Sequence, residues 1–202
     1  MINSIHGIVS QKTTIAGTGG TSLPTQVINV NFVDNVGNAN PLHWNRWDNE
    51  ADSSKNLLNS NDVETGVNLI WRSEIGTGWD YEGQGLQVDG SGEFPSEALE
   101  IFMQRGYCDM NMRFVNLSST KTYTLTFATV QAYNDPGDRT QVTINGQLLE
   151  LEGPNVANIV YKASLTVVNP TDGIIDIRVQ PSVKYNAGYG CLSAMILREF
   201  ES

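Results

Sequence analysis

The segment Trp79-Asp80-Tyr81-Glu82 carries the residue types that bind sugars. A flat aromatic ring covers the apolar face of a pyranose, and carboxylates accept hydrogen bonds from its hydroxyl groups. Glycines flank the segment on both sides and predict an exposed loop: Gly76, Gly78, Gly83 and Gly85. Aromatic and charged residues also anchor protein interfaces. The segment therefore predicts a binding surface, with either a glycan or another protein as its occupant.

Catalytic motifs are absent from the sequence. Neither Gly-x-Ser-x-Gly nor a glycine-rich phosphate loop with its lysine occurs. The two histidines, His6 and His43, lie far apart in dissimilar contexts, which argues against a zinc site. A glycosidase-type carboxylate pair stays open, because its members are defined by their separation in space. We expect a protein that is not an enzyme and has no catalytic residues.

Acidic side chains between residues 34 and 64 offer oxygen ligands of the kind that calcium takes: Asp34, Asp48, Glu50, Asp52, Asp62 and Glu64. Their spacing does not match the EF-hand loop. A solvated acidic surface is the favoured interpretation of these side chains. We predict no cofactor and no metal site, with a structural calcium ion as the alternative.

The charge balance is strongly acidic, because 22 Asp and Glu against 12 Lys and Arg give a net charge of −10. Such a chain has no basic excess to displace counterions from phosphates, which excludes a general nucleic-acid binder. No apolar run approaches the roughly 18 residues of a membrane span. We expect no secretory signal in residues 1–20. Cys108 and Cys191 are expected to be reduced and buried.

Strand-like runs recur from Val27 onward. Apolar and polar residues alternate with a period of two in three segments, the pattern of a sheet with one buried face: 110–114, 122–127 and 175–179. Asn145-Gly146 between two apolar runs predicts a tight hairpin, and Asn169–Gly173 predicts a second turn. Ser96–Gln104 is the only fair helix candidate, and residues 34–62 lack periodicity and predict a long irregular loop. The fold class is all-β, a two-sheet antiparallel β-sandwich of the jelly-roll type.

Residues 1–26 predict an extended N-terminal anchoring arm. Ile2, Ile5, Ile8 and Val9 give a short apolar start, and residues 11–26 are rich in Thr, Gly and Ser. Such a stretch buries too little apolar area to offset its own ordering entropy. We expect it to be ordered by other protein subunits of a large assembly, with packing on its own domain as the alternative. Residues 27–202 form the β-sandwich domain.

Four segments carry a resemblance to a known family: 28–32 with Trp44-Asn45, 114–127, 142–147, and 173–197. In this order they resemble the galactose-binding-like jelly rolls, which include malectin-like carbohydrate-binding modules. The resemblance covers about residues 28–197. It implies a lectin-type sandwich whose ligand sites, where present, are formed by loops at one end or by a concave sheet face. It transfers no sugar specificity.

The favoured hypothesis is a non-enzymatic structural protein of a bacteriophage virion. It would be a capsid-decorating, head-fibre or tail-associated protein. The arm would dock on neighbouring subunits and display the sandwich. The alternative is a carbohydrate-binding module, extracellular or at a cell surface, that recognises glycans through Trp79 and Tyr81 with neighbouring polar residues. Trp44 and Trp71 lie beside strand-like sequence and are expected to pack inside the domain. Surface glycans are thus a second class of expected partner.

Overall fold

The structure is a computed structural model. It describes residues 22–32, 40–47, 54–71, 80–82, 90, 92–99, 102–106, 110–130, 140–150, 160–184 and 187–202. Within these residues the regular secondary structure is almost entirely β-strand, with two short 3-10 helices, η1 (Ser96–Ala98) and η2 (Thr171–Gly173). The part of the chain that is described contains no helix long and apolar enough to cross a membrane.

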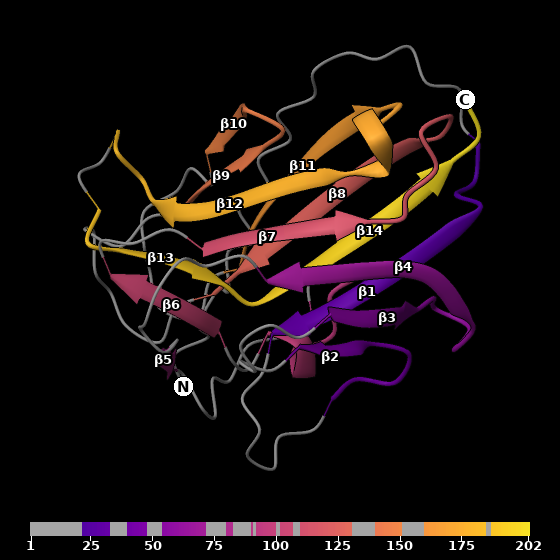
Figure 1. The fold of residues 1–202 in the computed structure, drawn as a ribbon. Helices are drawn as coiled ribbons and strands as arrows, with labels where there is room; N and C mark the ends of the chain where they lie inside the picture. The colour runs from indigo at the N-terminus through magenta and orange to yellow at the C-terminus, as the bar shows by residue number, and fades with distance from the viewer. Residues whose placement is uncertain are drawn as a thin grey trace.

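Two sheets pack face to face and a third, smaller sheet lies at one end (Figure 1). The five-stranded sheet has the order β11 (Tyr161–Val168), β8 (Thr122–Thr129), β14 (Ala194–Phe200), β1 (Gln26–Phe32) and β2 (Asn45–Trp47). The six-stranded sheet has the order β10 (Gln147–Glu150), β9 (Thr140–Ile144), β12 (Ile175–Pro181), β7 (Met110–Val115), β4 (Glu64–Trp71) and β3 (Ser54–Leu58). The three-stranded sheet has the order β13 (Tyr189–Leu192), β6 (Phe102–Gly106) and β5 (Asp80–Glu82). The predicted all-β sandwich is confirmed.

Nearly all neighbouring strands pair antiparallel. The exception among the described strands is β2, which pairs parallel with β1 through Val30 opposite Asn45. Alternation dictates which side chains face inward: β7 and β12 bury every second residue, and β8 directs Tyr123, Leu125 and Phe127 into the core. Among the described residues, this core contains 25 buried apolar side chains, mainly from the two large sheets and including Phe32, Trp47 and Phe114. Its burial is the main force that holds the two sheets together.

A second apolar cluster covers part of the outer face of the five-stranded sheet. Phe94, Ala98 and Leu99 pack there against Ala194 and Ile196 of β14 and their neighbours. The segment Gly92–Leu99 therefore acts as a flap over the β14 side of this sheet. Cys191 is buried in this cluster, as expected, whereas Cys108 lies outside the described residues.

The two predicted turns are confirmed. Asn145 and Gly146 have φ of 46° and 82°, the left-handed values that a two-residue hairpin between β9 and β10 requires. Asn169 to Gly173 also turns, and Gly173 has φ of 68° against the backbone of Leu117.

Two expectations about secondary structure are wrong. The helix at Ser96–Gln104 is only one 3-10 turn, because Pro95 supplies no side-chain cap and β6 pairs on both sides with other strands. The irregular loop at 34–62 contains β2 and β3. These strands escape a periodicity test because they are short and asparagine-rich, and Asn45 replaces ladder bonds with side-chain bonds to Leu58.

Candidate functional site

The predicted sugar-binding segment lies in the three-stranded sheet. Asp80–Glu82 form β5, an edge strand that pairs antiparallel with β6. The expectation of a loop is therefore wrong for these three residues. Glycines on either side delimit a strand that is too short to show alternation. Trp79 and the side chains of Asp80, Tyr81 and Glu82 lie outside what the structure describes, so their role in binding stays a prediction.

The three-stranded sheet is fixed to one end of the sandwich by close backbone contacts. A Cβ on Gly190 of β13 would stand 2.6 Å from the carbonyl carbon of Gln180 in β12. The Thr140 hydroxyl donates to the Cys191 carbonyl oxygen at 3.0 Å and accepts from the Cys191 N–H at 2.8 Å. The strands of this sheet therefore have a rigid support where β9 begins and β12 ends.

Two of the four tryptophans take packing roles. Trp47 is buried in the main core. Trp44 is half-buried against Phe94, with ring centroids 5.9 Å apart. Packing was expected for Trp44 and is confirmed, whereas the side chain of Trp71 lies outside the described residues.

The apolar residues of the predicted arm, Ile2, Ile5, Ile8 and Val9, also lie outside the described residues. Where the description begins, the chain joins the sandwich: the Thr25 N–H donates to the Glu199 carbonyl oxygen at 2.8 Å, and Gln26 opens β1. Among the described residues no three His, Cys, Asp or Glu side chains gather in a metal-binding group. Asp62 and Glu64 are described, and the other proposed calcium ligands are not.

One polar constellation on the outer face of the five-stranded sheet consists mainly of hydroxyl groups on β8 and β11. We call it the hydroxyl platform: Thr124 and Thr126 of β8, Ser164 and Thr166 of β11, and Arg198 of β14 with Glu93. The neighbours Leu125, Leu165 and Leu197 belong to the core, so alternation directs the platform residues to the outer face. The strand register places Thr124 opposite Thr166 and Thr126 opposite Ser164. Ser164 and Thr166 are exposed.

Hydrogen bonds lock the platform. The hydroxyl oxygens of Thr124 and Thr166 lie 3.1 Å apart, and the Ser164 hydroxyl donates to the Thr126 oxygen at 2.9 Å. Arg198 Nη1 donates to the same Thr126 oxygen at 3.2 Å. Arg198 Nη2 pairs with Glu93 Oε1 at 3.1 Å. Arg198 thus ties the hydroxyl pairs to the Gly92–Leu99 flap.

The direction of these bonds decides what the platform offers to a ligand. Ser164 uses its only proton on Thr126, so its lone pairs remain available to an approaching donor. In the Thr124–Thr166 pair one hydroxyl donates to the other, which leaves one proton and further lone pairs. Such an array of acceptors and a donor suits the hydroxyl groups of a sugar. Hydroxyls in one network also polarise each other and strengthen further bonds.

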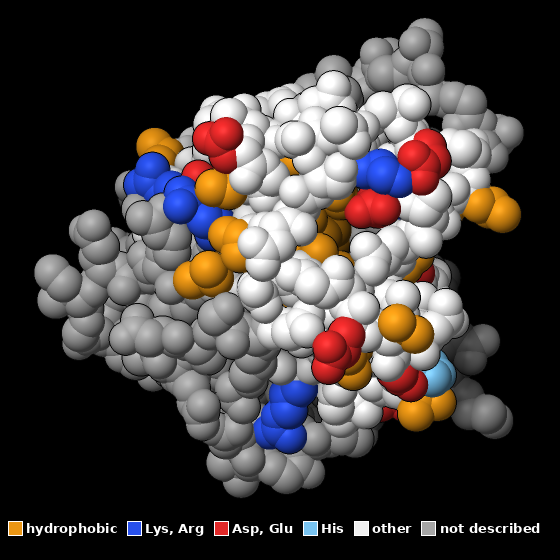
Figure 2. Space-filling model, turned by 45° about the vertical axis from the view of Figure 1, so that its right-hand side comes forward, with side chains coloured by type: hydrophobic (Ala, Val, Ile, Leu, Met, Phe, Trp, Pro, Cys, Tyr) orange, Lys and Arg blue, Asp and Glu red, His pale blue; other side chains and the backbone are white. Residues whose placement is uncertain are grey.

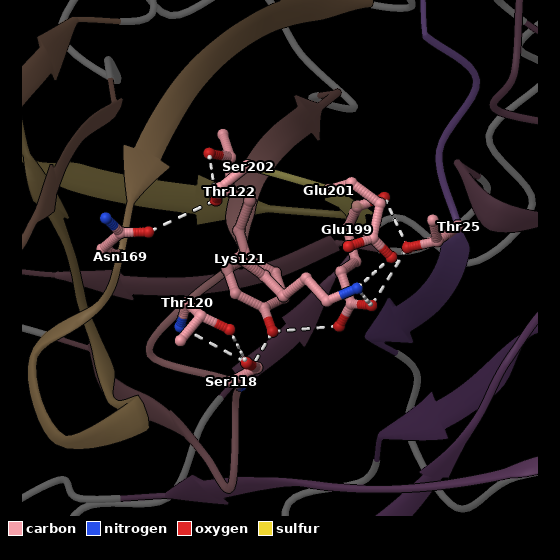
Figure 3. Close-up of polar contacts among 10 residues, drawn as sticks. Thr25, Ser118, Thr120, Lys121, Thr122, Asn169, Glu199, Glu201 and Ser202 are labelled. Atoms are coloured by element: carbon pink, nitrogen blue, oxygen red, sulfur yellow. Dashed lines mark hydrogen bonds and ion pairs between the residues drawn. The ribbon is translucent and has the colours of Figure 1, made fainter.

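A second polar cluster lies at the end of the sandwich away from the three-stranded sheet (Figure 3). Lys121 Nζ forms an ion pair with Glu201 and lies 3.8 Å from Glu199 Oε1. Thr25 Oγ1 donates to Glu199 Oε1 at 3.0 Å, and the Tyr123 hydroxyl donates to Glu199 Oε2 at 3.0 Å. The cluster ties β8, β14 and the entry to β1, and its groups satisfy one another. We assign it a structural role.

Sequence reasoning missed the hydroxyl platform, although a signal was present. Thr122, Thr124 and Thr126 alternate with core residues and mark a polar outer face on β8. The partner strand β11 lies about forty residues further along the chain, and only the folded register brings Ser164 and Thr166 beside it.

Comparisons with known proteins agree on the fold. No protein-family model matches the sequence, and no curated protein is significantly similar to it. The chain is similar to a structure of the plant peptide RALF23 in complex with FER and LLG2, with a TM-score of 0.54 and 12% identity over 88% of this chain and 49% of that chain. It is similar to Bacteroides uniformis beta-glucuronidase 2, with a TM-score of 0.54 and 12% identity over 86% of this chain and 18% of that chain. The ANX2 ectodomain from Arabidopsis thaliana gives a TM-score of 0.44 and 10% identity over 61% of this chain and 42% of that chain.

The chain spans about half the length of the first of these structures and less of the other two. At 12% identity, the two structures with a TM-score of 0.54 share the fold alone with this chain. The β-sandwich expected from the family resemblance is therefore confirmed as the architecture of this chain.

Proposed function

We propose that this protein is a non-catalytic carbohydrate-binding module that takes a neutral glycan on the hydroxyl platform. The observation that carries the proposal is the exposed Ser164 hydroxyl, which is held by its bond to the buried Thr126 and keeps unused acceptor lone pairs on the outer face of the sheet. Groups that are already ordered lose little entropy when a ligand arrives, so they bind better than free surface hydroxyls.

The fold accommodates this function, but it does not select it. β-Sandwiches of this type host many unrelated functions, so the argument for function comes from the site. The similar beta-glucuronidase acts, by its name, on a sugar substrate, and this chain corresponds to 18% of it. A sandwich that accompanies a sugar-processing enzyme is a suitable place for an auxiliary glycan contact.

Neutral sugars are the proposed ligand class for an electrostatic reason. The guanidinium of Arg198 is already engaged by Glu93 and Thr126, so it has little capacity for an anion. The net charge of −10 also repels acidic glycans at low salt. Lys162 of β11 lies at the edge of the platform beside the Gly92–Leu99 flap. Its Nζ is 3.6 Å from the position that a Cβ on Gly92 would take.

A glycan array followed by calorimetry on the ligands found tests the proposal. The full chain is compared with the double variant Ser164→Ala/Thr166→Val, which removes two exposed hydroxyls at little structural cost. We expect its affinity to fall about tenfold, equivalent to about 1.4 kcal/mol. The control is Thr143→Val, which removes a hydroxyl from the six-stranded sheet and leaves affinity within about twofold.

The predicted segment provides a competing location. In Trp79→Ala/Tyr81→Ala the platform is intact, so binding is expected to persist. If this variant loses binding and the platform variant keeps it, the carbohydrate function stands and its location moves to β5 and its surroundings. If the unmodified chain binds no glycan, the carbohydrate function is wrong.

The virion role stays a prediction without support from these findings. Residues 1–21 lie outside the described structure, and none of the similar structures named above is a virion protein. A glycan-binding role accords with the alternative location predicted from the sequence, outside the cell or at a cell surface. Nucleic acid remains excluded as a general partner by the acidic charge.

A further inference from the structure

Three exposed aliphatic side chains gather around the only histidine among the described residues. Leu42 is 80% exposed, Val63 is 56% exposed and Leu58 is 37% exposed. Leu42 precedes His43 and Val63 follows Asp62, while His43 Nδ1 lies 2.8 Å from Asp62 Oδ2. We call these five residues the His43 patch. Figure 2 shows hydrophobic side chains beside the histidine and neighbouring acidic groups on this face.

The patch is built on two turns that asparagine side chains hold in place. Asn29 Nδ2 donates to the His43 carbonyl oxygen at 3.3 Å, and Asn40 Nδ2 donates to the Trp44 carbonyl oxygen at 2.6 Å. In the second turn, Asn59 Oδ1 accepts from the N–H groups of Asn61 and Val63 at 2.9 and 3.1 Å. The side chains of the patch therefore project from a rigid support.

Both central residues of the patch adopt an unfavourable backbone conformation. His43 has φ of 63° and Asp62 has φ of 61°, values that cost a residue with a Cβ about 1 kcal/mol or more. Strain maintained by surrounding bonds is common at binding sites, where it fixes side chains before a partner arrives.

The chemistry of the patch favours a protein over a sugar. Its apolar contribution comes from Leu and Val, which lack the flat face that a pyranose needs. Trp44, which follows His43 in the sequence, packs on Phe94 instead. Exposed aliphatic side chains around a polar centre are the composition of a protein-binding surface.

Charge selects the kind of partner. Asp62 and the adjacent Glu64 are exposed carboxylates, and the whole chain carries −10. A second copy of the chain would bring the same negative charge and be repelled at low salt. A segment with Lys or Arg among aliphatic residues would be attracted and would cover the exposed leucines and valine.

We infer that the His43 patch is a docking surface for a protein segment that combines a basic side chain with aliphatic ones. The basic group would pair with Asp62 and Glu64, and the aliphatic groups would cover Leu42 and Val63. Leu58, the last residue of β3, would form the rim of this surface. The His43 patch lies where β4 begins, whereas the three-stranded sheet lies where β12 ends (Figure 1). The patch is therefore a different surface from the one predicted around β5.

The test is a selection of random displayed dodecapeptides on the full chain. Peptides that are enriched are synthesised, and their affinity is measured by fluorescence anisotropy for the unmodified chain and for two variants. Leu42→Ser/Val63→Ser removes the aliphatic contacts. Asp62→Asn removes a charge but keeps an amide oxygen for His43 and suits a left-handed backbone. We expect basic, aliphatic peptides whose affinity falls about tenfold in either variant.

Matched controls separate this surface from general attraction to an acidic protein. Leu148→Ser/Val183→Ser removes two other exposed aliphatic side chains, and Asp172→Asn alters another exposed acid with positive φ. Affinity within about twofold of the unmodified chain is expected for both. Equal losses in the patch and control variants, enrichment of acidic or uncharged peptides, or no enriched peptide would each overturn the inference. Retained thermal unfolding temperatures show that the variants are folded.

Discussion

Replacing Tyr123 by Phe tests the energetic reasoning behind the polar cluster of Figure 3. The Tyr123 side chain is 1% exposed, and its hydroxyl both accepts from the Ser118 N–H at 2.9 Å and donates to Glu199 at 3.0 Å. Phe keeps the ring and its packing while both hydrogen bonds are lost. The change therefore measures the hydroxyl group alone.

The expected loss of stability follows from the partners. A bond to a charged carboxylate contributes about 1.5–3 kcal/mol, and a backbone N–H without a partner costs about 1 kcal/mol or more. Glu199 keeps its bond from Thr25, which reduces the loss on that side. We expect Tyr123→Phe to lower the free energy of unfolding by about 3 kcal/mol. For a chain of this length the melting temperature should fall by roughly 9 °C.

Urea unfolding followed by tryptophan fluorescence provides the assay, with Thr25→Val as the control. Thr25 also bonds to Glu199, at 3.0 Å, but in an exposed position where water replaces the lost partner. Its removal should cost less than about 1 kcal/mol. If Tyr123→Phe costs no more than Thr25→Val, burial does not decide the strength of these bonds and the reasoning is refuted.

The same variant changes the response to alkaline pH. Burial is the largest effect and raises the pKa of Tyr123 above its ordinary value of 10; the bond from the Ser118 N–H lowers this pKa by less, and the bond to the charged Glu199 adds a further increase. The unfolded chain therefore loses this proton first, and stability falls as the pH rises above about 10. From about pH 9 to about pH 11 the advantage of the unmodified chain over Tyr123→Phe should shrink by about 1.4 kcal/mol. An advantage that stays constant over this range would contradict the raised pKa.

Three further changes have distinct expected outcomes. Gly173→Ala places a Cβ 2.3 Å from a facing carbonyl oxygen, so the free energy of unfolding measured in urea should fall by more than about 3 kcal/mol. Gly66→Ala, also at positive φ but with open space around it, should lower it by only about 1 kcal/mol. Asn145→Ala removes the oxygen that accepts from the Asp176 N–H at 2.8 Å, and alanine is less suited than asparagine to the left-handed backbone there. The free energy of unfolding should therefore fall by about 1–2 kcal/mol. Glu93→Gln frees the guanidinium that it pairs with, and calorimetry should then detect uronate-containing glycans that the unmodified chain does not bind.

The strands that can be predicted from the sequence are those with one face in the core and one in solvent. β7, β8 and β12 show this directly, because every second residue is apolar over five or more positions. The hairpin at Asn145-Gly146 is equally local, since its backbone conformation favours these two residues. Local chemistry decides both kinds of element, so no tertiary information is needed.

The elements that could not be predicted depend on partners distant in the chain. β2 is three residues long, and Asn45 fixes it through bonds to the backbone of Asn29 and Leu58. The strand β5 owes its existence to β6, whose sequence was expected to be helical. The platform needs β8, β11 and β14 side by side, and the His43 patch needs two turns nineteen residues apart.

The difference between the two surfaces follows from how each treats its charges. On the platform, the charged groups Arg198 and Glu93 neutralise each other, and the hydroxyls that remain are suited to uncharged donors and acceptors. In the His43 patch Asp62 Oδ2 lies 2.8 Å from His43 Nδ1, and the exposed carboxylate of Glu64 adds a second negative charge nearby. A neutral glycan gains little from such a charge, whereas a basic peptide gains both affinity and speed of association. One sandwich can therefore carry two recognition surfaces without competition, because a ligand suited to one is poorly matched to the other.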